Sequence, residues 1–565
     1  MLTLLPLSLL SALLVGLTYP SSSGNGVNAV RLPFQVRTTN PFGSNSSSLS
    51  SLSRRSHSKR GPSSATIPVH NTHNAEYISN ITLGGRQIPV LLDTGSSDLW
   101  VTGDVPNTTD LGKSVSLNYA VGNAHGNVHT ADLTFAGYSV SDQAYLLVTD
   151  TSSFSMDIVS QGFEGLIGLG PNTGSTILDE VDNDSASSVL DRIFSQNSTS
   201  ANYLTILLDR IGDTAENVTG TLTISEIAPG YEKISSMPKL SVDMVHKLTD
   251  ADQHWQTYTD VNGVIGPDGQ PIQIDSIVPS APDNQLVVVF DSGYTLPQVP
   301  RAMSDAIYGR VPGAVYNEAS EVWTVPCSQM INLTFKFGGM DYPIHPLDVS
   351  SSDFNMVDAT GNPVCVGAFQ PITSAFSLLG EYDIILGMAF MRNTYTLLDY
   401  GNWIKDSSID QNDPFVQLLP LTDPTTAKND FVKIRLSGVD STGDAAHQLL
   451  PADQMQHSPF SAGEKKKMYA EKVLSRWPYI LVGCLVFVLL MIGLITWRCC
   501  VWRKRRNAAK AKTAASMGIS TGGLSKPEPA YPLEMQGTSS PVLAKTNYSM
   551  DDPYAYHDTK ARDVV

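Results

Sequence analysis

Short apolar runs separated by turn residues fill the middle of the chain, from Tyr77 to about Leu436. Runs of this length, bounded by Gly, Asn, Asp and Ser, are typical of β-strands. Clear examples are residues 77–85, 88–93, 143–149, 203–209, 285–291, 331–339 and 395–403. Only residues 188–194 and 302–309 show brief helical patterns. The pattern predicts an all-β region that is too long for one small sandwich.

Two longer apolar runs lie outside this region. Residues 1–20 are apolar and precede small residues, which is typical of a secretory signal peptide. Residues 479–497 carry no charge and, at about 1.5 Å per residue, can cross a hydrocarbon layer of roughly 30 Å. Arg503–Arg506 follow this run on its C-terminal side. A signal peptide and one transmembrane helix at 478–498 predict a single-pass type I protein, with its long N-terminal part extracellular or lumenal.

Three segments lack the composition of a packed core. Residues 21–60 are Ser-rich and end in two dibasic pairs, which predicts a pro-segment or linker cut by a furin- or kexin-like enzyme. Residues 437–477 lose the strand pattern and predict a stalk that leads to the membrane. Residues 499–565 predict a disordered cytoplasmic tail.

The five cysteines divide along this topology. Cys327 and Cys365 alone fall in the exterior part, so we expect them to form one disulfide. Cys499 and Cys500 stand at the cytoplasmic edge of the predicted span and are candidates for S-palmitoylation.

Charge and sequons also indicate an exterior protein. The formal net charge of −17 argues against a nucleic-acid partner. Six N-x-S/T sequons fall in the β-rich region and predict a glycosylated surface: Asn80, Asn107, Asn183, Asn197, Asn217 and Asn332.

An internal repeat carries the candidate chemistry. VLLDTGSSDLWV at 90–101 has a counterpart in VVVFDSGYTLPQV at 287–299. Each copy is an apolar strand that runs into Asp, then Thr or Ser, then Gly. An apolar-apolar-Gly strand follows each copy, at 166–168 and at 385–387. Two similar lobes with one Asp on each turn would bring a pair of carboxylates together at their junction.

On these motifs, residues 75 to about 436 resemble the pepsin-like aspartic proteases. Trp100, the stretch 119–122 and the C-terminal cysteine pair add to the resemblance. It implies a bilobal all-β fold of two β-barrel-like lobes with the active-site cleft between them. We expect the N-terminal lobe at 72–235 and the C-terminal lobe at 236–436.

The resemblance also implies roles for particular residues. Asp93 and Asp291 would be the catalytic pair, acting on a water held between them, with no metal and no cofactor. The hydroxyls of Thr94 and Ser292 would brace the two loops, and Ser96 would hydrogen-bond Asp93. The glycines that follow, Gly95 and Gly293, would let the backbone approach closely.

Two departures from the family pattern affect the site. Tyr119 matches the tyrosine of the family's β-hairpin flap, but Ala120 and Val121 replace the usual Gly-Thr. Tyr294 stands where the family has Thr or Ser, three residues after Asp291. We expect the outer hydrogen bond to Asp291 either to be lost or to come from the hydroxyl of Tyr294 or Thr295.

Three hypotheses follow for function. The first is an active, monomeric endopeptidase that cuts peptide or protein substrates at the cell surface or in a vacuolar lumen. The second is a weak or inactive member that binds peptides or proteins through the same cleft. The third is a stalked adhesion or wall-structure protein that keeps the two Asp motifs as relics. Both aspartates and both glycines are retained, which favours the first.

Overall fold

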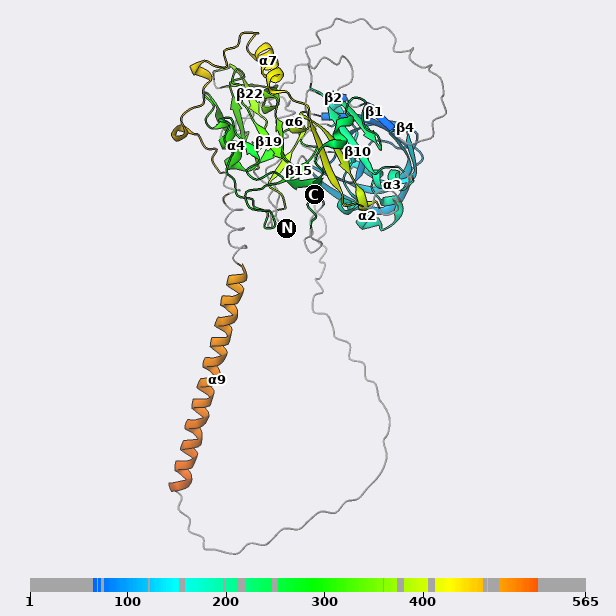
Figure 1. Ribbon diagram of the computed structural model, residues 1–565. Helices are drawn as coiled ribbons and strands as arrows, with labels where there is room; N and C mark the ends of the chain where they lie inside the picture. The colour runs from blue at the N-terminus through cyan, green and yellow to red at the C-terminus, as the bar shows by residue number, and fades with distance from the viewer. Residues whose placement is uncertain are drawn as a thin grey trace, which may run out of the picture. The chain divides into compact units, whose positions relative to one another are not determined.

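The computed structural model describes residues 65–516 apart from short gaps, of which the longer ones are 152–157, 211–219, 246–252, 373–380, 405–411 and 466–476. It divides into one unit that ends at Arg476 and a second that begins at Trp477 (Figure 1). The predicted signal peptide and pro-segment, and the tail beyond 516, lie outside the described residues.

The first half of the unit that ends at Arg476 is built on an eight-stranded sheet. In sheet order its strands are β2 His70–Thr72, β3 Glu76–Leu83, β4 Arg86–Asp93, β9 Gly165–Gly168, β5 Leu99–Thr102, β8 Tyr138–Asp150, β7 Gly122–Phe135 and β6 Thr109–Tyr119. Strands β4 and β9 are parallel, whereas β5 runs antiparallel to β9 on its other side. This order leaves the loop between β4 and β5 at the carboxyl end of a buried strand.

The second half repeats that arrangement in a five-stranded sheet: β13 Gln256–Tyr258, β15 Val287–Phe290, β24 Ile384–Leu386, β16 Gln298–Val299 and β23 Gln370–Pro371. Here β15 and β24 are parallel and β16 runs antiparallel to β24. A four-stranded sheet contains β17 Val315–Asn317, β18 Val322–Val325, β22 Pro363–Gly367 and β21 Ser350–Val357. A three-stranded sheet contains β14 Val264–Ile265, β19 Thr334–Phe337 and β20 Met340–Pro343. The mostly β, pepsin-like fold class predicted from the sequence is confirmed.

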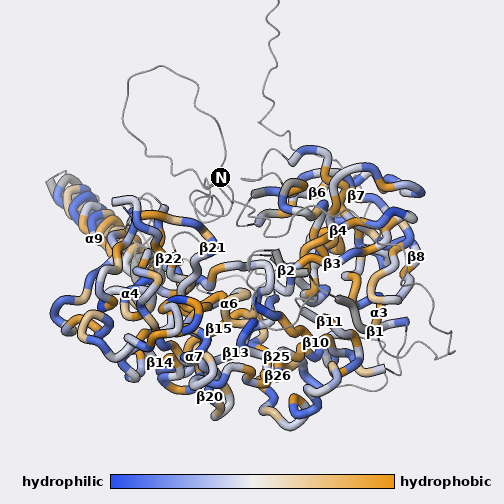
Figure 2. Tube along the Cα trace, turned by 90° about the horizontal axis from the view of Figure 1, so that it is seen from above, coloured by the Kyte–Doolittle hydropathy of each residue, from blue (hydrophilic) through white to orange (hydrophobic). Residues whose placement is uncertain are grey.

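A six-stranded sheet joins the two halves. Its strands are β1 Ala65–Pro68, β11 Gly220–Ile224, β10 Tyr203–Leu208, β25 Thr394–Asp399, β26 Phe415–Pro420 and β12 Leu240–Ser241. The central pair, β10 and β25, is antiparallel and places Tyr203 opposite Asp399. In Figure 1 the yellow β25 therefore lies beside the green-cyan β10. Hydrophobic residues predominate along the inner strands of the unit (Figure 2), and their side chains form its core.

Helices are short in this unit. The structure has α2 Thr176–Val181, α3 Val189–Ser195, α4 Arg301–Tyr308, α5 Pro346–Val349, α6 Met388–Met391 and α7 Pro424–Arg435. Single 3-10 turns are η1 Val159–Gln161, η2 Asn172–Gly174, η3 Asp184–Ala186, η4 Glu232–Ser236, η5 Gly401–Trp403, η6 Ala445–His447 and η7 Ala452–Gln454. The two predicted helical patterns correspond to α3 and α4. Helix α7 was not predicted, although Asp423 caps it and Pro424 is its first residue.

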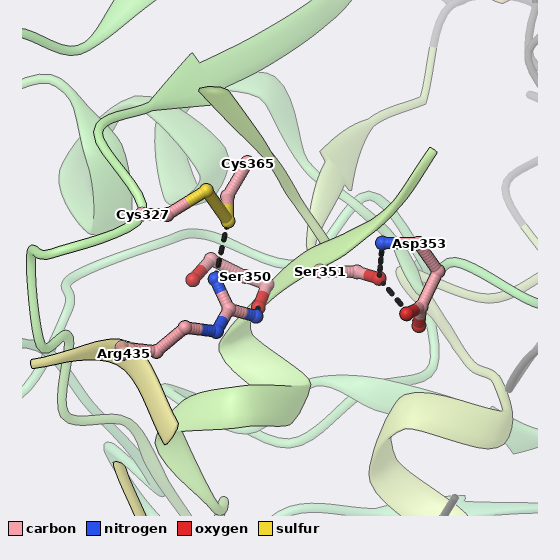
Figure 3. The surroundings of a disulfide bond; sticks show 6 residues. All are labelled: Cys327, Ser350, Ser351, Asp353, Cys365 and Arg435. Carbon is pink, nitrogen blue, oxygen red and sulfur yellow. Dashed lines mark hydrogen bonds between the residues drawn. A yellow bond between two sulfur atoms is a disulfide. The ribbon is translucent and has the colours of Figure 1, made fainter. Parts of the chain in front are cut away.

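The predicted disulfide between Cys327 and Cys365 is present, with an S–S distance of 2.03 Å. Arg435, at the end of α7, lies against it (Figure 3). The guanidinium of Arg435 donates to Cys365 Sγ and, at 3.1 Å, to the carbonyl oxygen of Ser350. The disulfide joins the turn after β18 to β22, and Arg435 attaches the end of α7 to it.

The first part of the predicted stalk is attached to the body of the unit. The N–H of Leu450 donates to the carbonyl of Arg310 at 2.8 Å, and that of Gln456 donates to Gly309 at 2.9 Å. Ser458 Oγ donates to the buried carboxylate of Asp305 at 2.5 Å. Residues 445–460 therefore run along α4 rather than standing free.

The described residues of the second unit form one long helix, α9 Trp477–Ser516. Its stretch Leu481–Lys512 is long and apolar enough to cross a membrane, and its apolar window is fully exposed. Helix α9 therefore continues for several turns beyond residue 498, where the predicted span ends.

Candidate active site

Two parallel strand pairs place the aspartates. Strand β4 pairs with β9 so that Asp93 stands opposite Gly168. Strand β15 pairs with β24 so that Phe290 stands opposite Leu386, and the N–H of Asp291 then donates to the carbonyl of Leu386 at 3.0 Å. Strands β9, β15 and β24 are buried throughout, and β4 becomes apolar and buried as it approaches Asp93, so each chain turns where its Asp is reached.

The two turns are tied together by reciprocal hydrogen bonds. The N–H of Thr94 donates to Ser292 Oγ at 3.0 Å, and the N–H of Ser292 donates to Thr94 Oγ1 at 2.9 Å. Each hydroxyl then donates onward to the opposite strand: Thr94 to the Phe290 carbonyl (2.9 Å) and Ser292 to the Leu92 carbonyl (2.7 Å). These groups are buried, so four hydrogen bonds in a dry environment hold the loops in register.

The two carboxyl groups lie together at this junction. Asp93 is 5% exposed and Asp291 is 7% exposed, and their side chains are within hydrogen-bonding range of each other. The N–H of Gly95 donates to Asp93 Oδ1 at 2.9 Å, and the N–H of Gly293 donates to Asp291 Oδ1 at 2.7 Å. Burial and the neighbouring charge of Asp93 raise the pKa of Asp291 well above its ordinary value. The pair therefore retains a shared proton at a pH where isolated carboxyl groups are ionised.

Close approach requires glycine after each acid. A Cβ on Gly95 would lie 2.2 Å from Asp291 Oδ2, and one on Gly293 would lie 2.6 Å from Asp93 Oδ1. Each glycine therefore packs against the carboxyl group of the opposite loop.

The first loop has a further donor and an aromatic cover. Ser96 Oγ donates to Asp93 Oδ2 at 2.5 Å. Tyr119 closes the hairpin of β6 and β7, where it pairs with Gly122, and its ring lies 6.3 Å from that of Trp100. The Tyr119 phenol lies near Ser96 and Trp100, and burial raises its pKa well above the ordinary value. Ala120 and Val121 lie outside the described residues.

The second loop is organised differently. The carboxyl of Asp291 accepts a backbone hydrogen bond from Gly293, and the N–H of Tyr294 donates to the backbone carbonyl of Asp291 at 3.4 Å, close enough to the carboxyl group to lower its pKa. Only side-chain hydroxyls were expected as donors from the sequence, so this backbone N–H was not predicted. Burial, followed by nearby Tyr382 and the two aspartates, raises the pKa of the Tyr294 phenol well above its ordinary value. The phenol therefore stays neutral beside the carboxyl pair.

A buried ion cluster lies behind the second loop. Thr295 and Leu296 line a cavity of about 20 Å³ together with Asp348 and Arg392. Asp348 Oδ1 accepts from Arg392 Nε at 2.8 Å, and Asp348 Oδ2 accepts from Arg210 Nε at 3.1 Å. Burial alone would raise the pKa of Asp348, but the two guanidinium groups outweigh it and hold that pKa well below its usual range.

One residue beside the catalytic loops was not found from the sequence. His254 Nδ1 lies 3.1 Å from the carbonyl oxygen of Gly95, and its ring packs edge-on against Tyr382 at 5.9 Å. The available signal was its place two residues before β13, the strand that pairs with β15. No group of three or more His, Cys, Asp or Glu side chains is placed to hold a metal ion in the part of the chain that the structure describes.

The predicted glycosylation sites stay predictions. Asn80, Asn107, Asn183 and Asn332 are exposed on the surface. Asn197 and Asn217 lie outside the described residues.

Comparison with known proteins agrees with this geometry. A family model of eukaryotic aspartyl proteases matches residues 76–404, which is more than half of the chain. "Major aspartyl peptidase 1" of Cryptococcus neoformans var. grubii is 24% identical over 381 residues, covering 62% of this chain and 72% of that protein. "Aspartic protease" of Phaffia rhodozyma is 25% identical over 374 residues, covering 62% and 79%. "Aspartic-type endopeptidase ctsD" of Aspergillus fumigatus is 24% identical over 346 residues, covering 58% and 64%.

Fold and site thus define a two-lobed hydrolase with paired carboxyl groups. The chain belongs to the eukaryotic aspartyl protease family. It spans as little as 61% of the length of some relatives that it matches.

Proposed function

We propose that this protein is an aspartic endopeptidase in which Asp93 and Asp291 activate a water molecule against a peptide bond. The observation that carries the proposal is the reciprocal bracing of the two loops through Thr94 and Ser292. That bracing fixes two buried carboxyl groups within hydrogen-bonding range of each other, and the raised pKa of Asp291 supplies a proton for chemistry.

The reaction needs one ionised and one protonated carboxyl group. The ionised group accepts a proton from the water, whose oxygen adds to the scissile carbonyl carbon. The protonated group gives its proton to the carbonyl oxygen, which forms a neutral gem-diol. When the diol collapses, the C–N bond breaks and a proton passes to the leaving nitrogen. No covalent bond to the protein forms, and the pair returns to its singly protonated state.

The hairpin of β6 and β7 supports a role as the cover of the substrate. Tyr119 stands at its end, and its phenol interacts with Ser96, which in turn donates to Asp93. Closure of this hairpin over an extended peptide would exclude water from the dyad.

The test uses the full-length chain in detergent, with Asp93→Asn and Asp291→Asn variants beside it. Each protein is incubated with a mixed peptide library from pH 3 to 7, and cut sites are read by mass spectrometry. We expect cleavage by the wild type and a loss of about 10²- to 10⁴-fold in each variant. A folded wild type that binds library peptides but cuts none would favour the peptide-binding hypothesis.

We also propose that α9 anchors the catalytic part outside the cytoplasm. The apolar stretch from Leu481 and the basic run at 503–506 support one span with its C-terminal end in the cytoplasm. Treatment of the full-length protein with an N-glycosidase should lower its apparent mass, because the sequons precede the span. Replacing Asn80, Asn183 and Asn332 by Gln should reduce that shift in steps. A protein without glycans, expressed in a eukaryotic host, would contradict this orientation.

A further inference from the structure

His254 is placed near the catalytic pair by the segment that leads into β13. In the antiparallel pairing of β13 and β15, Gln256 stands opposite Val289, and the N–H of Phe290 donates to the Trp255 carbonyl at 2.9 Å. The chain bends at Trp255, where the N–H of Gln256 donates to the carbonyl of His254 at 2.9 Å. His254 is thus one residue beyond the last backbone contact of this pairing, on the side where β15 ends and Asp291 follows.

The hydrogen bond of the ring agrees with that position. Nδ1 of His254 lies 3.1 Å from the carbonyl oxygen of Gly95, in the first catalytic loop. A carbonyl oxygen can only accept, so Nδ1 carries a hydrogen whether the ring is neutral or cationic. The second proton is therefore gained at Nε2, and protonation leaves the bond to Gly95 in place. Since Gly95 itself packs against the carboxyl of Asp291, the ring is one residue away from the dyad.

Hydrogen bonds hold the segment that carries His254 in place. The indole N–H of Trp255 donates to the Leu169 carbonyl at 3.1 Å, and the N–H of Leu169 donates to the Asp93 carbonyl at 2.7 Å. Trp255 is fully buried. The imidazole is therefore attached to the same scaffold as Asp93, so its distance from the pair is set by the fold.

Three elements bring polar groups toward this ring. The first catalytic loop contributes the Gly95 carbonyl, and Tyr382 packs on the ring while interacting with Asp291 and the Tyr294 phenol of the second loop. The segment before β24 supplies Glu381 and Tyr382. Burial and the nearby charge of Glu381 raise the pKa of Tyr382 to about 12, so that both phenols are neutral at the pH of interest. His254 is thus the group of this set that can become positive.

We propose that His254 is a positioning residue of the catalytic pair, which holds the Gly95 peptide through Nδ1 and, once protonated, extends activity to lower pH. This inference rests on the proposed function. A histidine ordinarily has a pKa of about 6.5, so the ring is expected to be a cation across the acidic limb. A cation beside the pair favours its singly ionised form over its neutral form. A lower pH is therefore needed to protonate the pair completely and abolish its activity.

Two substitutions separate the hydrogen bond from the charge. In His254→Asn the amide N–H can still donate to Gly95 but cannot become positive, whereas His254→Phe removes both properties. For both variants the acidic limb of kcat/KM should move to higher pH by about 0.5 to 1 pH unit. The Phe variant should in addition lose about tenfold in kcat because the Gly95 peptide is no longer held.

His447 offers a matched control. Its Nδ1 lies 2.6 Å from a backbone carbonyl, that of Ser441, in the segment that runs along α4. His447→Asn should leave both limbs of the pH profile on those of the wild type. All profiles are measured on the full-length protein in detergent with one peptide selected from the cleaved library. An acidic limb of His254→Asn that overlies that of the wild type overturns the proposal.

A second measurement does not depend on cleavage. Imidazole ¹⁵N resonances of the full-length protein are followed between pH 4 and 8, and the signal of His254 is assigned by its loss in His254→Asn. By linkage, removing both carboxyl groups in the Asp93→Asn/Asp291→Asn double variant should lower the titration midpoint of His254 by about 0.5 to 1 pH unit. An unchanged midpoint overturns the inference, even in an active enzyme. If the midpoint is lowered in the variant but the wild type cuts no peptide, the electrostatic coupling is supported and only the proposed function is contradicted.

Discussion

The two catalytic loops begin alike and diverge after the glycine. Both are reached by an apolar strand that pairs in parallel with an apolar-apolar-Gly strand, and both glycine N–H groups donate to their own acid. Beyond that point the first loop continues with Ser96, which donates its hydroxyl to Asp93. The second continues with Tyr294, whose backbone N–H donates to the carbonyl oxygen of Asp291 and lies near its carboxyl group.

The surroundings differ in the same sense. The strand after the first loop carries Trp100 into an apolar cluster, where Tyr119 also packs. The residues after the second loop, Thr295 and Leu296, line a polar cavity that contains the buried Asp348 ion cluster. The repeated part of the sequence therefore builds the acid pair, and the unrepeated part determines how each acid is supported.

The largest effect should follow loss of the support behind the second loop. Asp348→Asn leaves Arg210 and Arg392 without their common counter-charge, which should destabilise the fold by about 3–5 kcal/mol. Urea unfolding monitored by tryptophan fluorescence measures this at pH 6. The exposed Asp353, which lines the same cavity, is the control, and Asp353→Asn should cost less than about 0.5 kcal/mol.

The same carboxylate gives the pH dependence a definite sign. Because the folded pKa of Asp348 is held below its usual range, its stabilisation is complete above about pH 4 and is lost as the pH falls toward the folded value. Wild-type stability should thus fall between pH 4 and 3, and that part of the fall should be absent in Asp348→Asn. Equal slopes for the two proteins would contradict this assignment.

Adding one methyl group to each loop compares the two close approaches. A Cβ on Gly95 would lie 2.2 Å from the opposing carboxyl oxygen, against 2.6 Å for Gly293. Gly95→Ala should lower kcat by about 10²-fold or more, and Gly293→Ala should lower it by less. The measurement is kcat at the pH optimum of each variant. A more severe loss in Gly293→Ala would reverse the predicted order.

The brace between the loops should respond symmetrically. Thr94→Val leaves the Ser292 N–H unpaired, and Ser292→Ala leaves the Thr94 N–H unpaired. Each should cost about 1–3 kcal/mol in the free energy of unfolding. The double variant should cost less than the sum, since both changes break the same network. Strict additivity would mean that the loops are held by other contacts.

The smallest effect concerns the residue three positions after each acid. Tyr294→Thr restores a hydroxyl that can donate to the Asp291 carboxylate, which favours the ionised form. Both limbs of the pH profile should move to lower pH by about half a pH unit. Ser96→Ala removes the equivalent donor from the first loop and should move the acidic limb the other way. Identical profiles for Tyr294→Thr and the wild type would show that the backbone N–H groups of this loop support the Asp291 carboxylate without an added hydroxyl.

Local signals in the sequence were enough to predict the acid loops, the strands that carry them and the disulfide. Short apolar runs bounded by turn residues, and the Asp-Thr/Ser-Gly motif, can be recognised from neighbouring residues only. The pairing of β10 with β25 could not be predicted in this way, because neither strand sequence indicates a partner that is so distant along the chain. Asp348 was missed for a related reason. A charged residue is usually exposed, and only the fold brings Arg210 and Arg392 to it.

Two other features left weak signals. Helix α7 has a cap and a first-turn proline, but only three of its twelve residues are buried, so its apolar pattern is faint. His254 lies outside both copies of the Asp motif. It can be related to the catalytic pair only when the segment leading into β13, the partner strand of β15, is considered together with the motif.

The brace between Thr94 and Ser292 joins residues 198 positions apart. A ribosome that adds about 5–20 residues per second needs roughly 10 to 40 s to make that stretch. During this time the nascent chain holds the first acid without its companion, and no paired carboxyl groups exist in any conformation it can adopt. Synthesis therefore sets a delay before the acid pair can form, and the half-made chain spends that delay without the means to cut its neighbours.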